Sequence, residues 1–204
     1  MTELSYARRG HGPTLVLIHG IGSHWRVWSP ILDEVSLHRD VIALDLPGFG
    51  DSPPWPSPPP GGPEPGSVAH LADQVVAFLD GSGVRTFDVA GSSLGGGIAL
   101  ELGRRGLARS VTAFAPVGFW STAGRRWCQT VVGAARTGAA RLDPALPRIM
   151  GTRAGRAAFC AAFYAHPARL PAADCVAAAR ALAAAPGFAE TRRAFGRLRP
   201  WRYT

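Results

Sequence analysis

Residues 86–105 read Thr-Phe-Asp-Val-Ala-Gly-Ser-Ser-Leu-Gly-Gly-Gly-Ile-Ala-Leu-Glu-Leu-Gly-Arg-Arg. A short apolar run ends at Gly91, and a stretch with helical spacing begins just after Ser93. This pattern predicts a strand that turns sharply into a helix, with Ser93 at the tip and with Gly91 and Gly95 where a Cβ atom would clash. Such a turn lifts the Ser93 hydroxyl clear of the sheet and places it at a helix N-terminus, which favours developing negative charge. Ser93 is therefore a candidate nucleophile.

Two earlier segments accompany this turn. Residues 14–22 read Thr-Leu-Val-Leu-Ile-His-Gly-Ile-Gly, and residues 41–52 read Val-Ile-Ala-Leu-Asp-Leu-Pro-Gly-Phe-Gly-Asp-Ser. In this order and spacing, the three segments resemble the oxyanion loop, the strand-four turn and the nucleophile elbow of the α/β-hydrolase family. Trp28 fits the tryptophan often found early in the helix after the oxyanion loop. The resemblance covers residues 3–120.

The resemblance implies a role for each matching residue. Ser93 would attack an acyl carbonyl, and the backbone N–H groups of Ile21 and Leu94 would hold the oxyanion. The residues alone leave another interpretation open, in which Ser93 is a helix N-cap that lies between glycines by chance. The resemblance implies neither a metal nor a cofactor, and we expect none here.

Three polar residues near the motifs have a structural interpretation. His19 ends a buried strand, so we expect its ring to hydrogen-bond nearby backbone rather than take part in chemistry. Asp45 and Asp51 are expected to form turns through Asx hydrogen bonds rather than to act as acids.

The general base is the missing part. A serine hydroxyl needs a base to take its proton, and in this fold the chain order is serine, acid, histidine. One histidine, His166, follows Ser93, and nothing in the sequence places it over the turn. His24 and His70, expected in loops, are no better placed, and the segment after the strand at 109–115 offers no carboxylate.

Three hypotheses for function follow. The first is hydrolysis of an ester, thioester, lactone or similar carbonyl substrate by a serine nucleophile. The second is a catalytically inactive truncated remnant or a non-catalytic ligand-binding fragment. The third keeps the scaffold but changes the reaction, as in C–C bond hydrolases, acyltransferases and cofactor-free perhydrolases. A serine at position 93 argues against dehalogenases and epoxide hydrolases, which use aspartate there.

The order of elements predicts an α/β fold with a doubly wound, mostly parallel sheet of the α/β-hydrolase type and a helical lid. Strands are expected at 3–8, 13–19, 40–45, 86–91 and 109–115, and helices at 24–36, 67–81 and 94–105. Residues 1–120 would form the N-terminal part of the core, and residues 121–200 the lid. The last strands and the C-terminal helix of the core are expected to be absent. The exposed edge of the last strand would then favour self-association.

The lid assignment rests on an Ala- and Arg-rich stretch at 121–198 with helical spacing, broken by five prolines. Its apolar residues are expected to form the lid core, and their presence favours a hydrophobic small-molecule substrate. The phenylalanines in question are Phe159, Phe163, Phe188 and Phe195. The ending Pro200–Thr204 falls where a core strand should start, and we interpret it as a lost reading frame, a shortened chain or a degenerate paralogue.

Composition narrows the remaining possibilities. All 22 basic residues are arginine, and the net charge is +8, but the arginines are scattered without a nucleic-acid-binding motif. The absence of lysine excludes a P-loop, and no signal peptide or membrane-spanning run is visible. Cys128, Cys160 and Cys175 are widely spaced and are expected to be buried and reduced, which favours a cytoplasmic protein. The proline-rich stretch after Asp51 is expected to be a stiff surface loop; the alternative is that it shapes one rim of the pocket, with Trp55 touching substrate or the lid.

Overall fold

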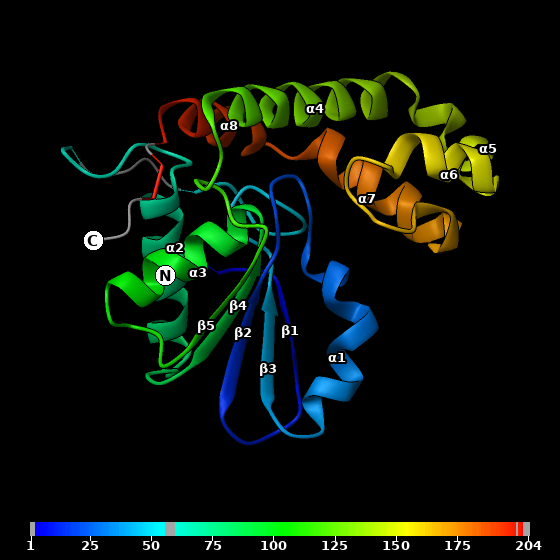
Figure 1. Cartoon of the computed structure of the whole chain (residues 1–204). Coiled ribbons are helices and arrows are strands. Elements are labelled where there is room, and N and C mark those ends of the chain that lie inside the picture. Colours follow the sequence, from blue (N-terminus) through cyan, green and yellow to red (C-terminus); the bar gives the residue numbers. More distant parts are fainter. Residues whose placement is uncertain (1–2, 56–59, 199, 202–204) are drawn as a thin grey trace.

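The computed structural model describes residues 3–55, 60–198 and 200–201, and it shows a sheet flanked by helices, with a second helical layer above it (Figure 1). The strands of the sheet are β1 (Tyr6–Arg9), β2 (Thr14–Ile18), β3 (Asp40–Leu44), β4 (Asp88–Ser92) and β5 (Val111–Phe114). Their spatial order is β1-β3-β2-β4-β5, and all pairs are parallel except β1 with β3. The predicted mostly parallel sheet is confirmed.

Side chains alternate between the two faces of the sheet, as the pleat requires. Val16 and Ile18 of β2 pack into the core cluster formed with α2 (Val68–Gly81) and α3 (Leu94–Arg104). Leu17 packs into the other cluster, against Trp28 and the helix α1 (Ser29–Ser36). Because β2 is central and covered on both faces, its carboxyl end at His19 is held in a fixed position between β3 and β4.

The predicted helical stretch contains α4 (Thr122–Arg141), α5 (Leu146–Gly151), α6 (Arg153–Cys160), α7 (Ala172–Ala184) and α8 (Phe188–Arg197). We call residues 122–197 the helical segment. Figure 1 places it over the carboxyl ends of the strands. The prolines mark helix starts rather than interruptions, since Pro147 lies in the first turn of α5 and Pro171 is the N-cap of α7.

The helical segment is attached to the sheet layer at several points. The Gly187 N–H donates to the Gly48 carbonyl over 2.9 Å, next to the turn that follows β3. Leu182 of α7 lies so close to Gly22 that a Cβ on that glycine would approach its Cδ1 atom to 2.2 Å. The segment therefore packs directly on the loop after β2.

The phenylalanines of this segment divide between two environments. Phe188 and Phe195 are buried in the main core, and Phe159 packs against a separate cluster within the helical segment. Phe163 is 46% exposed, which is contrary to the expectation of a lid-core position. Its helix, α6, ends at Cys160, so Phe163 lies in the turn beyond it.

Several boundaries differ from those predicted. The first strand starts at Tyr6, and the helix expected over 24–36 begins as a short 3-10 helix, η1 (Trp25–Trp28), before α1. The helix predicted over 67–81 is present as α2, and it contains His70, which therefore does not approach the site from a loop. His70 lies in the first turn of α2, and the side chain of the N-cap residue Ser67 accepts a hydrogen bond from the His70 N–H.

Two further predictions concern the proline-rich loop and the cysteines. Trp55 packs edge-on against His70 and touches Gly187 of the helical segment, whereas Pro56, Pro58 and Pro59 lie outside the described residues. All three cysteines are free; Cys160 and Cys175 are buried, as expected, but Cys128 is only partly so. None of the helices in the described ranges is both long and apolar enough to cross a bilayer.

Candidate functional site

Ser93 occupies the sharp turn between β4 and α3. Its φ of 55° and ψ of −112° are strained for a residue with a side chain. The surrounding backbone holds this conformation, because the Ser93 N–H donates to the Phe114 carbonyl over 2.9 Å and the Ser93 carbonyl accepts from Gly97 and Val117. The turn predicted from the sequence is present, and the hydroxyl stands at the N-terminus of α3.

Gly91 and Gly95, on either side of Ser93, are required because backbone segments approach one another closely at both positions. A Cβ atom on Gly91 would come within 2.1 Å of the Gly95 carbonyl oxygen. A Cβ atom on Gly95 would come within 2.1 Å of the Ile18 carbonyl oxygen and 2.6 Å of the His19 carbonyl oxygen. The turn can therefore sit against the end of β2 only because neither position carries a side chain.

This contact places the loop after β2 beside the serine. A Cβ atom built on Gly20 would lie 3.3 Å from the Ser93 Cβ and 3.8 Å from its Oγ. Leu94 directly follows Ser93 as the first residue of α3, and Ile21 directly follows Gly20, whose backbone lies against the Ser93 side chain. Within the described parts of the chain, neither the Ile21 N–H nor the Leu94 N–H donates a hydrogen bond.

His19 fixes the peptide that carries one of these donors. Its Nδ1 lies 2.7 Å from the Gly20 carbonyl oxygen, and its Nε2 accepts from the Leu46 N–H over 2.9 Å. The ring is therefore neutral, with its proton on Nδ1. Because the Gly20 carbonyl and the Ile21 N–H belong to one trans peptide, they point in opposite directions. Holding the carbonyl toward His19 turns the N–H away from it.

The electrostatics agree with this arrangement. His19 is fully buried, and burial lowers the pKa of its imidazole from 6.5 to about 4. A neutral ring at physiological pH keeps Nε2 available as an acceptor. The predicted structural role of His19 is confirmed by both hydrogen bonds.

Asp45 holds the same loop from the other side. Its carboxylate accepts from the Trp25 N–H over 2.5 Å and from the Asp51 N–H over 2.9 Å, and the residue is fully buried. Asp45 therefore has a structural role, but not through the predicted local Asx hydrogen bond, because its partners lie six residues after it and twenty residues before it. Asp51 instead forms a surface ion pair with Arg26 at 3.2 Å. The sequence did not indicate that Asp45 also ties η1 to the turn after β3, because Trp25 lies twenty residues away.

Among the described residues, no hydrogen bond joins Ser93 to any of the three histidines considered as a base. His166 is exposed at the start of the 3-10 helix η3 (Pro167–Arg169), and the Nδ1 of His70 accepts from the Gly66 N–H over 3.1 Å. His24 is half-buried after the oxyanion loop, and burial lowers its pKa, opposed by the nearby Asp45 charge. Across the described ranges, no side chain hydrogen-bonds the Ser93 Oγ.

A metal centre has no counterpart in the described part of the chain, where no group of three or more His, Cys, Asp or Glu residues could hold an ion.

Comparison with known proteins places this geometry in context. Residues 13–133 match the model of a family described as having the alpha/beta hydrolase fold. The chain is 38% identical over 120 residues to a dihydrolipoyllysine-residue acetyltransferase component of the acetoin cleaving system from Cupriavidus necator. It is 45% identical over 96 residues to the epoxide hydrolase EphH from Mycobacterium tuberculosis.

These matches cover parts of each protein. The first spans 57% of this chain and 30% of the relative, and the second spans 46% of this chain and 42% of the relative. A hydrolase of known structure from Pseudomonas aeruginosa superposes with a TM-score of 0.66 at 22% identity, over 96% of this chain and 69% of the other. The chain thus matches less than half the length of these two curated relatives, and the structural likeness concerns the fold.

Proposed function

Because this chain belongs to the family with the alpha/beta hydrolase fold, we propose that it is a serine hydrolase for a small carbonyl substrate. The substrate class is an ester, thioester, lactone or related carbonyl compound with a hydrophobic acyl part. The observation that carries the proposal is the strained Ser93 at the strand-to-helix turn, with its side chain against Gly20 and the adjacent Ile21 N–H unpaired.

In the proposed reaction, the Ser93 Oγ attacks the carbonyl carbon as its proton passes to a base. The carbonyl oxygen becomes an oxyanion and accepts from the N–H groups of Ile21 and Leu94. Each such donor, fixed before charge develops, lowers the barrier by about 3 kcal/mol. The leaving group departs with a proton, and water then hydrolyses the acyl-serine.

The described structure gives Ser93 no general base, and this supports a second candidate function. A serine without a base is a poor nucleophile. The Ser93 Oγ lacks a side-chain partner throughout the described ranges, which favours a catalytically inactive remnant or a ligand-binding fragment. The two candidates differ in whether this chain by itself activates Ser93.

A fluorophosphonate probe separates them. We expect the wild-type chain to be labelled at Ser93, Ser93→Ala to lose the label, and Ser92→Ala, at the neighbouring strand residue, to keep it. Equal labelling of Ser93→Ala would refute the nucleophile. No labelling of a wild-type chain with a native circular dichroism spectrum would establish the inactive alternative.

A substrate panel addresses the reaction type once labelling is seen. Short-chain nitrophenyl esters test hydrolysis, with release of nitrophenol lost in Ser93→Ala. Carbon–carbon diketones, acyl acceptors and peracid formation test the C–C bond hydrolase, acyltransferase and perhydrolase alternatives. Activity in one of these assays, without turnover of the nitrophenyl esters, would replace ester hydrolysis as the proposed reaction.

A further inference from the structure

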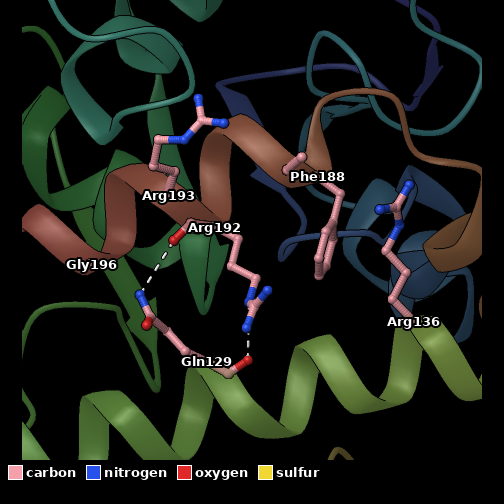
Figure 2. A pocket seen from close by; sticks show the side chains of 7 residues that line it. Gln129, Arg136, Phe188, Arg192, Arg193 and Gly196 are labelled. Carbon is pink, nitrogen blue, oxygen red and sulfur yellow. Dashed lines mark hydrogen bonds between the residues drawn. The ribbon is translucent and has the colours of Figure 1, made fainter.

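A groove of about 440 Å³ lies along the seam between α4 and α8, away from the residues assigned to the oxyanion and the nucleophile. Figure 2 shows its walls, with Gln129 and Arg136 contributed by α4 and the other residues by α8. The lining residues are Gln129, Arg136, Phe188, Ala189, Arg192, Arg193 and Gly196. Three of them are arginines, and none is acidic.

Arg192 is fixed at the seam by a reciprocal pair of hydrogen bonds. Its Nε donates to the Gln129 carbonyl oxygen over 3.1 Å, and the Gln129 side-chain amide donates to the Arg192 carbonyl oxygen over 3.3 Å. These bonds anchor the base of the guanidinium group. Its two terminal nitrogens have no hydrogen-bond partner within the described ranges.

Arg136 reaches the groove from the opposite helix. Its guanidinium lies 4.9 Å above the centre of the Phe188 ring, and Figure 2 shows Arg136 and Arg192 on either side of that ring. The Nη2 group makes one long bond of 3.5 Å to the Ala185 carbonyl oxygen, and the Nε atom is buried without a partner. Arg193 points away from both, so two guanidinium groups face the groove.

The charge balance leaves these groups without counterions. Residues 121–198 contain twelve arginines and three acidic residues, whereas residues 1–120 contain eight arginines and eleven acidic residues. The ion pairs recorded for the helical segment join Arg180 to Asp143 and Arg197 to Glu64. Like charges on facing helices repel one another, and a bound anion would relieve that repulsion through charge-assisted hydrogen bonds.

We propose that this groove binds the oxyanion group of a small ligand, a phosphate monoester or a carboxylate. Arg136 and Arg192 supply the donors, and the Phe188 ring forms the wall between them. Because the two arginines come from different helices, the bound anion ties α4 to α8. The proposal goes beyond the hydrolase reaction and does not depend on an active Ser93.

The test is a titration of the 204-residue chain with inorganic phosphate and, separately, with acetate, at constant ionic strength set by sodium chloride. Binding is followed by calorimetry and by the rise in melting temperature. We expect Arg136→Gln and Arg192→Gln each to weaken binding at least tenfold. Arg126→Gln removes a charge from the exposed side of the same helix, α4, and is expected to change binding less than twofold.

The outcomes distinguish the alternatives. Tighter binding of phosphate identifies a phosphate-bearing ligand, and tighter binding of acetate identifies a carboxylate ligand. Equal weakening by all three substitutions would overturn the site, because it would show diffuse attraction by the basic surface. The proposed site would also be overturned if phosphate and acetate gave no more binding heat or rise in melting temperature than sodium chloride alone. Should a glutamine variant lack the native circular dichroism spectrum, Arg192→Lys keeps the charge and is expected to lose bidentate binding.

Discussion

The hydrogen bonds of His19 predict a pH-dependent stability that can be isolated experimentally. Its folded pKa is about 4 because the ring is buried, and its unfolded pKa is near 6.5. Between these values the unfolded chain binds more protons, so stability is fully present above 6.5 and falls as the pH drops toward 4. Protonation of Nε2 would also place a donor against the Leu46 N–H, which now donates to it.

Linkage gives the magnitude of the effect. For a group with these two pKa values, the free energy of unfolding is lower at pH 5 than at pH 7 by about 2 kcal/mol. The test substitution is His19→Gln, whose side-chain amide can still hydrogen-bond the backbone but has no proton to gain over this pH range. We expect the stability gap between wild type and variant to narrow by about 2 kcal/mol between pH 7 and pH 5.

Urea denaturation at a series of pH values measures this gap. The lowered pKa values of His24 and His70 act with the same sign, but they are common to both proteins and cancel. His166→Gln, at an exposed position, reports on the loss of a histidine as such. A gap between wild type and His19→Gln that stays constant with pH would refute the assignment of a buried neutral ring.

Three shorter predictions concern the packing of α3 on the sheet, the carboxylate of Asp88, and the edge strand β5. Gly95→Ala should cost at least about 3 kcal/mol in urea denaturation, because its Cβ would lie 2.1 Å from the Ile18 carbonyl oxygen, whereas Gly151→Ala, with open space around it, should cost less than about 1 kcal/mol. Hydrogen bonds from Arg109, Ser110 and Arg39 lower the pKa of the buried Asp88 carboxyl, so Asp88→Asn should lower the free energy of unfolding by about 2 kcal/mol at neutral pH. The difference in stability between wild type and variant should vanish in acid, because the wild-type protein loses this stabilisation as the pH falls through the folded pKa of Asp88. Thr112→Lys on β5, which pairs on one side only among the described strands, should reduce self-association in sedimentation velocity, and an unchanged sedimentation coefficient would contradict a role for this edge.

The strands and the turn at Ser93 could be predicted because their signals are local. An apolar run, a serine between glycines and a helical period lie within twenty residues, and the backbone follows from them. The same holds for His19, whose two bonds reach the next residue and the end of the neighbouring strand β3. Parallel pairing of β2 with β3 puts those two strand ends side by side.

Other features depend on helix packing and could not be predicted. The groove between α4 and α8 brings Gln129 to Arg192 across 63 residues of sequence. An Ala- and Arg-rich stretch with proline breaks fixes neither the pairing of its helices nor the face that each arginine occupies.

A serine hydrolase needs oxyanion donors and a general base, and a chain supplies these two groups in different ways. The proposed oxyanion donors are main-chain N–H groups, so their position depends on the turn at Ser93, on close approach at Gly20 and Gly95, and on the hydrogen bonds of His19 to the same loop. The base must be a side chain delivered from elsewhere, and its place depends on the topology of the rest of the molecule. A chain can therefore keep the complete geometry for stabilising an oxyanion while its serine remains without a base. The fluorophosphonate experiment is informative for that reason, because labelling requires the base and the oxyanion donors together, whereas the phosphate titration requires neither.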